Sequence, residues 1–97
     1  MVKFMNWLLQ SFPSVVIYHK EGSMPEKVYR FNTAGAKFKG SEGLVKVLEI
    51  EWTSPAYGRF RVKGKFNIHT DYEHNILILK SQDTIIRIIG EPYGEGA

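Results

Sequence analysis

The sequence feature that most constrains the fold is the alternation of apolar and basic residues in RFRVKGKFNIH, residues 59–69. Such a period of two is typical of a half-buried β-strand, because successive side chains point to opposite faces. We therefore predict one central strand over 59–69, with its apolar side on a core and its cations facing outward. Phe60, Val62, Phe66 and Ile68 share one parity, and Arg59, Arg61, Lys63 and Lys65 share the other.

The preceding segment, GLVKVLEIEW at 43–52, carries a matching pattern, and TSPAY at 53–57 can supply a turn between the two strands. A hairpin in one register sets apolar residues opposite apolar residues and acids opposite bases, which stabilises a sheet by about 0.2–1 kcal/mol per pair. A shift by two residues, with Glu49 opposite Lys63, preserves this match. The predicted pairs are Ile50 with Phe60, Leu48 with Val62, Glu51 with Arg59 and Glu49 with Arg61.

A short helix is predicted over residues 2–12, because apolar residues recur there at three- and four-residue spacing and Pro13 stops further propagation. Eleven residues are marginal as an isolated helix, so the apolar side must pack on something. One interpretation is that it covers the sheet. The other is that Phe4, Trp7 and Leu8 form an interaction surface for a second copy, another protein or a membrane surface.

The remaining elements are predicted to be mostly β. Strands are expected over 14–20, 27–32, 75–80 and 84–90, with a short one within AKFK at 36–39. The last two are apolar on both parities, which predicts strands that lie centrally or are covered on both faces. Residues 91–97 are expected to be a flexible tail.

The fold class that follows is α+β, with an N-terminal helix packed on a twisted, mostly antiparallel five- to six-stranded sheet or partial barrel. The chain has 97 residues, which indicates a single domain over 1–97. Central strands are expected over 44–52, 59–69, 75–80 and 84–90. The predicted core consists of Phe4, Leu8, Ile17, Leu48, Ile50, Trp52, Phe60, Val62, Phe66, Ile76, Ile78, Ile86 and Ile88.

Composition limits the chemistry. The chain has no cysteine, which excludes disulfides and thiolate sites. Neither a cleavable leader nor an apolar run long enough to span a membrane is recognisable, so we expect a cytoplasmic protein with no membrane partner. The formal charge is +3, and it is uneven: residues 1–69 hold eleven Lys and Arg against five acids, and residues 70–97 hold two against five.

The row of four cations allows two interpretations. In one, the cations are solvated and partly paired with Glu49 and Glu51. In the other, they follow the backbone of a single-stranded nucleic acid, since side chains of one parity lie about 6.8 Å apart along a strand. Aromatic rings could then stack on bases. The residues of this candidate site are Arg59, Arg61, Lys63 and Lys65 with Tyr57, and the other rings considered are Tyr18, Tyr29, Phe31 and Tyr72.

The polar cluster HTDYEHN at 69–75 is predicted to be a turn, because Asp and Asn cap nearby backbone groups. The alternative is a metal or catalytic site built on His69, Asp71 and His74. Arg87 interrupts an apolar strand and therefore requires an acidic partner, a stacked ring or a ligand. His19 is expected to be packed or hydrogen-bonded. No catalytic constellation, metal site or cofactor motif is visible, so we expect a protein that is not an enzyme.

The segment from Gly64 to Asn75, in which GKF is followed by an Asp and an Asn, resembles the first motif of the Sm family, and an N-terminal helix before the strands is also similar to Sm proteins. The resemblance implies RNA binding, with Asp71 and Asn75 near a base. The interval from Gly64 to Asp71 is one residue longer than the family pattern, and the second motif is interrupted in IIRIIG at 85–90. We therefore assign no family.

Two functions remain as expectations. The first is a small non-enzymatic protein-interaction module that associates with itself or another protein through the apolar helix face or a strand edge. The second is a single-stranded nucleic-acid-binding protein that uses the basic strand. The first expectation rests on the apolar surplus of the helix and the last hairpin, which exceeds what one small core can cover.

Overall fold

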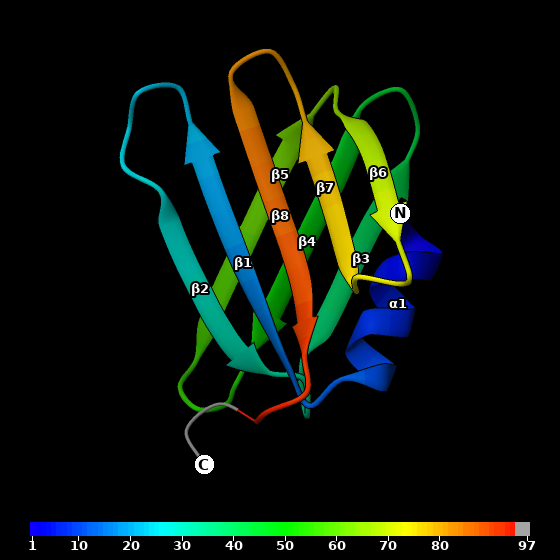
Figure 1. The fold of residues 1–97 in the computed structure, drawn as a ribbon, viewed down its shortest axis with the longest axis vertical. Helices are drawn as coiled ribbons and strands as arrows, with labels where there is room; N and C mark the ends of the chain where they lie inside the picture. Colours follow the sequence, from blue (N-terminus) through cyan, green and yellow to red (C-terminus); the bar gives the residue numbers. More distant parts are fainter. Residues whose placement is uncertain (95–97) are drawn as a thin grey trace.

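The structure, a computed structural model, describes residues 1–94 and consists of one helix and two antiparallel sheets packed face to face (Figure 1). One sheet has five strands in the order β2-β1-β8-β7-β6, and the other has three in the order β3-β4-β5. The predicted α+β class is confirmed. The elements are α1 (Val2–Ser11), β1 (Ser14–Glu21), β2 (Lys27–Asn32), β3 (Lys37–Glu42), β4 (Lys46–Trp52), β5 (Gly58–Gly64), β6 (Asn67–Asp71), β7 (Ile76–Lys80) and β8 (Thr84–Glu91).

The predicted hairpin between β4 and β5 forms in the predicted register. Ile50 lies opposite Phe60 and Leu48 opposite Val62, while Glu49 lies opposite Arg61. Ile50 is fully buried, so the apolar side of this hairpin faces the space between the sheets. Matching of both apolar and charged residues therefore selected the register, as expected for a sheet with one buried face.

The single strand predicted over 59–69 is wrong. β5 ends at Gly64, Lys65 and Phe66 connect the sheets, and β6 begins at Asn67 on the edge of the other sheet. The core lies between the two sheets. Residues of the same parity therefore face it in both β5 and β6, and the alternation continues through the break. Both strands lie at sheet edges rather than centrally. On β5 the outward cations discourage pairing with other chains.

The core lies between the two sheets and under α1. Phe31 of β2 stacks on Trp52 of β4 with ring centroids 4.4 Å apart, which joins the sheets across their interior. Most predicted core residues are buried, but Val62 and Phe66 are only half-buried. Missed core residues include Met5, Val15, Phe31, Leu77 and Leu79.

The parity predicted for β7 is also wrong. Leu77 and Leu79 are fully buried, whereas Ile76 and Ile78 are half-buried on the opposite face of the strand. Because β7 is apolar on both parities, its pattern does not distinguish the inner face from the outer one. The neighbouring strand settles the question, since Leu77 lies opposite buried Ile88 of β8.

Helix α1 lies at one side of the two sheets, near β3 and β6 (Figure 1), and packs on β3, β8 and β1. Phe4 and Leu8 belong to the core of the monomer, so two of the three residues predicted as an interaction surface are already covered. Trp7 is half-buried, and its ring contacts Tyr72 of the β6–β7 turn at 4.8 Å. The interpretation in which the helix packs on the sheets is the one that the structure shows.

The segment predicted as a flexible tail begins inside a strand. Glu91 is the last residue of β8 and pairs with Ser14 of β1, whose hydroxyl donates a hydrogen bond to the carbonyl of Tyr93. These contacts attach the start of the segment to the sheet, and residues 95–97 lie outside the described residues. Within residues 1–94, no helix combines the length and apolar character needed to cross a membrane.

Candidate interaction surfaces

Most of the predicted basic row lies on the outer side of the three-stranded sheet, which we call the charged face. It consists of alternate residues from β3, β4 and β5, with two glutamates on the central strand and cations on both flanking strands. Lys65 follows β5 and does not belong to this face. The residues of the charged face are Lys37, Lys39, Glu49, Glu51, Arg59, Arg61 and Lys63.

The two arginines of the charged face are held by one glutamate. Arg59 Nη2 lies 3.0 Å from Glu49 Oε1, and Arg61 Nε lies 3.4 Å from Glu49 Oε2. Arg61 therefore has the partner that the sequence predicted, whereas Arg59 reaches diagonally to Glu49 instead of Glu51. The Tyr57 hydroxyl donates to Glu51 Oε1 at 3.1 Å, and this hydrogen bond raises the pKa of Tyr57.

The aromatic residues considered for base stacking already have partners within the molecule. Tyr72 contacts Phe4 and Trp7, each at 4.8 Å between ring centroids. Tyr29 packs on Phe60 at 5.3 Å, inside the space between the sheets. Phe31 is buried, and Tyr57 bonds to Glu51, as described above. This arrangement weakens the interpretation of the basic row as part of an open stacking platform.

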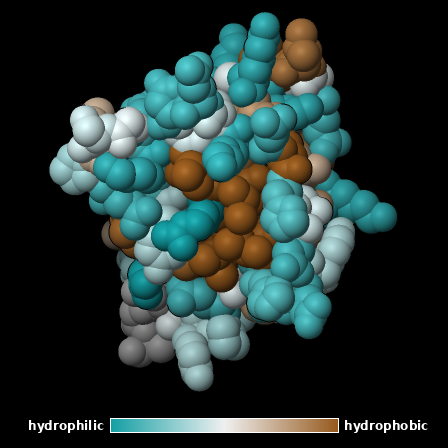
Figure 2. All heavy atoms as spheres, turned by 45° about the horizontal axis from the view of Figure 1, so that its top comes forward, coloured by the Kyte–Doolittle hydropathy of each residue, from teal (hydrophilic) through white to brown (hydrophobic). Residues whose placement is uncertain are grey.

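The outer side of the five-stranded sheet has the opposite character, and we call it the apolar face. Figure 2 shows hydrophobic side chains gathered into one patch near the middle of this side, with hydrophilic ones around it. Ile85 is 40% exposed and Val28 is 50% exposed. The apolar face consists of Val16, Val28, Ile76, Ile78, Ile85 and Ile89, which share the outer parity of β1, β2, β7 and β8. Val16 is buried beneath its neighbours, and the other five are half-buried or exposed.

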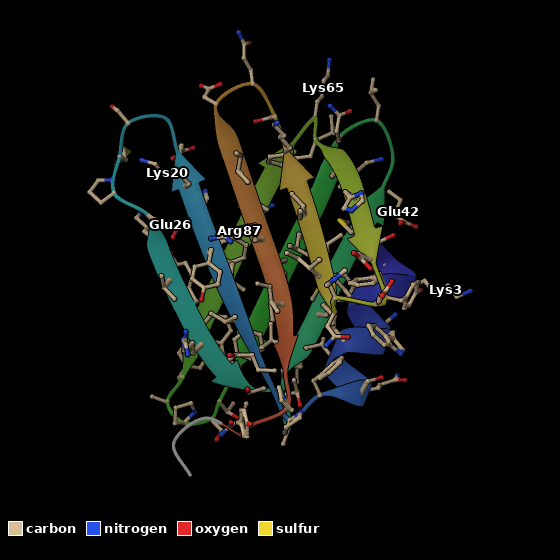
Figure 3. The ribbon with its side chains drawn as sticks, viewed as in Figure 1. Lys3, Lys20, Glu26, Glu42, Lys65 and Arg87 are labelled. Atoms are coloured by element: carbon tan, nitrogen blue, oxygen red, sulfur yellow. The ribbon has the colours of Figure 1, made fainter. Side chains whose placement is uncertain are left out.

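Arg87 lies in the middle of the apolar face. Its guanidinium lies 4.5 Å from the centre of the Tyr18 ring, and Nη2 lies 3.5 Å from Glu26 Oε2. Figure 3 shows Arg87 extending from β8 toward Glu26, across β1. The structure thus provides both a stacked ring and an acidic partner, as the sequence analysis required for this residue. Its side chain is still 41% exposed.

Charges lie at opposite ends of the apolar face. Lys20 of β1 and Lys80 of β7 share one cross-strand row with Ile85. Asp71 of β6 and Glu91 of β8 lie at the opposite end of the sheet. Arg30 of β2 lies at this end too, in the cross-strand row of Asp71, and its Nη1 is 3.9 Å from Glu91 Oε1. The face therefore has a basic end and, opposite it, an end at which two acids outnumber Arg30 and which we call the acidic end. The apolar residues lie between the two ends.

The predicted turn forms over residues 72–75, while 69–71 of the polar cluster belong to β6. Asp71 Oδ1 accepts hydrogen bonds from the backbone N–H groups of Glu73 at 2.9 Å and His74 at 3.2 Å, and Oδ2 lies 2.6 Å from His74 Nδ1. The hydrogen bond with the His74 side chain is the main reason why the pKa of Asp71 is lowered. Over residues 1–94, no group of three or more such side chains is placed to hold a metal ion.

The structure adds a feature that no sequence pattern indicated, a hollow at one end between the two sheets. It has a volume of about 360 Å³ and is lined by residues of β1, β5, the β7–β8 turn and the start of β8, together with Lys65 and Phe66. His19, predicted to be packed or hydrogen-bonded, lines this hollow and packs edge-on against Phe60 at 5.6 Å. Only the fold brings these segments together.

Comparisons of the chain with models of known protein families, with curated proteins and with solved structures found no match. The candidate surfaces are therefore interpreted from their own geometry.

Proposed function

We propose that the protein is a small non-enzymatic interaction module that self-associates by packing the apolar faces of two copies against each other. The observation that carries this proposal is the position of β7 and β8, which are inner strands of the five-stranded sheet and are apolar on both sides. Their inward side chains fill the core, while Ile76, Ile78, Ile85 and Ile89 on the outward side remain partly exposed. Exposed apolar patches of this kind mark interaction sites.

The size of the five-stranded sheet suits a dimer interface. Five strands about 4.8 Å apart and about 17–26 Å long present on the order of 500 Å² of flat sheet. The accessible surface area is larger than this flat area because side chains project from the sheet. A standard interface buries about 800 Å² on each partner. Sheets pack face to face at about 10 Å, so a second sheet can cover the apolar face as the three-stranded sheet covers the inner one.

The charges around the apolar face favour a second copy as the partner. In a two-fold dimer the same patch meets itself. An axis that runs across the strands places the basic end, with Lys20 and Lys80, over the end of the partner that carries Asp71 and Glu91. Complementary charges of this kind fix orientation more than they add affinity.

Glutamate substitution of Ile85 tests the proposal. Ile85 is already 40% exposed, so Ile85→Glu should fold, yet it places a charge in the dimer interface. Sedimentation velocity over a concentration series should show a dimer for the unsubstituted protein and a dimer at least about tenfold weaker for the variant. The matched control is Leu44→Glu, because Leu44 is 79% exposed in the β3–β4 turn, away from the apolar face.

The control should dimerise as the unsubstituted protein does, and circular dichroism should show that both variants are folded. A monomer at all concentrations up to about 1 mM, which corresponds to about 4 kcal/mol of binding, would contradict the proposal. Equal weakening by Ile85→Glu and Leu44→Glu would also contradict it, because the effect would then follow added charge rather than position.

The alternative, binding of single-stranded nucleic acid by Arg59, Arg61, Lys63 and Lys65 with Tyr57, has less support. Two of these cations are paired with Glu49, one lies beyond the end of β5, and Tyr57 bonds to Glu51. Four cations in one continuous row were the basis of that interpretation, and the described residues do not provide such a row.

A further inference from the structure

The hollow between the sheets lies where three segments meet at one end of the molecule. The end of β1 supplies His19 and Glu21, the β7–β8 turn supplies Ser81, the start of β8 supplies Thr84, and the end of β5 with the crossover supplies the rest. Figure 3 shows Lys65 at this end, on the crossover from β5 to β6. The crossover bounds the hollow because the chain changes sheets at Gly64. The remaining lining residues are Arg61, Val62, Lys63, Gly64, Lys65 and Phe66.

The lining of the hollow is basic and has hydroxyl groups beside the cations. Lys63 belongs to the charged face and also borders the hollow, because β5 is an edge strand. Lys63 and Lys65 have no ion pair among residues 1–94, whereas Arg61 is paired with Glu49. Lysine ammonium groups bind phosphate as point charges, and hydroxyls and imidazole can add hydrogen bonds. Glu21 is the only acid in the lining, so the hollow favours an anion over a cation.

The lining also has an apolar part. Val62 and Phe66 are half-buried, pack against the core and line the same hollow. The volume of about 360 Å³ lies within the range of about 300–1,000 Å³ that is usual for small-molecule sites. A ligand that fits both parts carries an anionic group at one end and a ring or other apolar group at the other.

We propose that this hollow binds a phosphate monoester of about mononucleotide size. The phosphate lies between Lys63 and Lys65, near the hydroxyls of the β7–β8 turn, and the ring of the ligand lies on Val62 and Phe66. This site shares no residue with the apolar face, so the inference is independent of the proposed self-association. Failure of either proposal leaves the other unaffected.

Isothermal titration of the full chain with adenosine monophosphate tests the inference. We expect saturable binding of one nucleotide per chain, tighter than the binding of inorganic phosphate measured in the same buffer. The double variant Lys63→Gln with Lys65→Gln should weaken nucleotide binding by about tenfold or more. The matched control is Lys37→Gln with Lys39→Gln, which removes the same charge from β3, where neither lysine lines the hollow.

Three results would overturn the inference. The first is the absence of saturable nucleotide binding, and the second is equal weakening by the two double variants, which would indicate nonspecific attraction to a basic protein. The third is binding of a labelled single-stranded oligonucleotide without binding of the mononucleotide. In that case the cations would bind an extended nucleic-acid strand and not a ligand in this hollow. Two-dimensional proton–nitrogen correlation NMR spectra of the variants establish that each one is folded.

Discussion

The outer faces of the two sheets differ in how their side chains are stabilised. On the charged face, the central strand carries glutamates and the flanking strands carry cations, so Glu49 holds Arg59 and Arg61 within the monomer. On the apolar face, the central strands carry isoleucines. Arg87 among them has an ion pair and a stacked ring, and Arg30 pairs with Glu91 at one end of the face. The arginines and glutamates of the charged face thus find partners within the monomer. On the apolar face, by contrast, covering the exposed side chains would lower the free energy.

The largest expected effect is a difference in stability between substitutions on the inner side of the five-stranded sheet and substitutions on its apolar face. Leu77→Ala removes a fully buried side chain of β7 and should lower the free energy of unfolding by about 2–5 kcal/mol. Ile78→Ala, its neighbour on the apolar face, should cost about 1 kcal/mol at concentrations where the protein is monomeric. Urea denaturation of both variants at low concentration measures the difference, and equal losses would refute the assigned parity.

A smaller effect tests whether the charged face is satisfied internally. Glu49→Gln removes the partner of both arginines, and because the Glu49 side chain is 25% exposed, the loss in unfolding free energy should be about 0.5–1 kcal/mol. This loss should shrink in high salt, which screens exposed pairs. Glu73→Gln, at an exposed acid with no ion pair within residues 1–94, should change stability little. If Glu49→Gln stabilised the protein, the ion pairs would not support this face.

The smallest effect concerns Asp71, at the acidic end of the apolar face. Its pKa is lowered in the folded protein, so its contribution to stability is complete above the unfolded pKa of about 3.9 and disappears as pH falls through the folded pKa. Asp71→Asn can retain the turn because the amide oxygen still accepts backbone hydrogen bonds. The midpoint temperature of thermal unfolding should therefore fall less steeply from pH 6 to pH 2 for this variant than for the unsubstituted protein.

Asp83→Asn provides the control for that experiment, because Asp83 is an exposed acid in the β7–β8 turn with no ion pair in the described part of the chain. Its pH profile should follow that of the unsubstituted protein. Identical profiles for Asp71→Asn and the unsubstituted protein would mean that the contact with His74 does not stabilise the turn.

The hairpin of β4 and β5 was predictable because two independent patterns, apolar and charged, select the same register. The break at Gly64 was not, since inward residues remain inward when a strand crosses between two packed sheets. The parity of β7 was not predictable either, because Leu77 and Ile78 are equally apolar and only the pairing with β8 distinguishes them.

The candidate sites show the same division. Arg87 could be recognised from the sequence as a residue that needs a partner, because it interrupts an apolar strand. The identity of its partners, Glu26 and Tyr18, depends on β1 and β2 lying beside β8. The hollow was not predictable, because His19 and Lys65 are far apart in the sequence and meet only through the arrangement of the two sheets.

Methyl NMR with a soluble paramagnetic agent tests the central claim, that the apolar face is buried between two copies, most directly. Spectra at low and high protein concentration report the solvent accessibility of each isoleucine and leucine methyl group. The account predicts that Ile78, Ile85 and Ile89 become protected from the agent as concentration rises, while Leu44 stays accessible. If Ile85 remained as accessible at high concentration as at low concentration, the apolar face would not be the surface through which the protein associates.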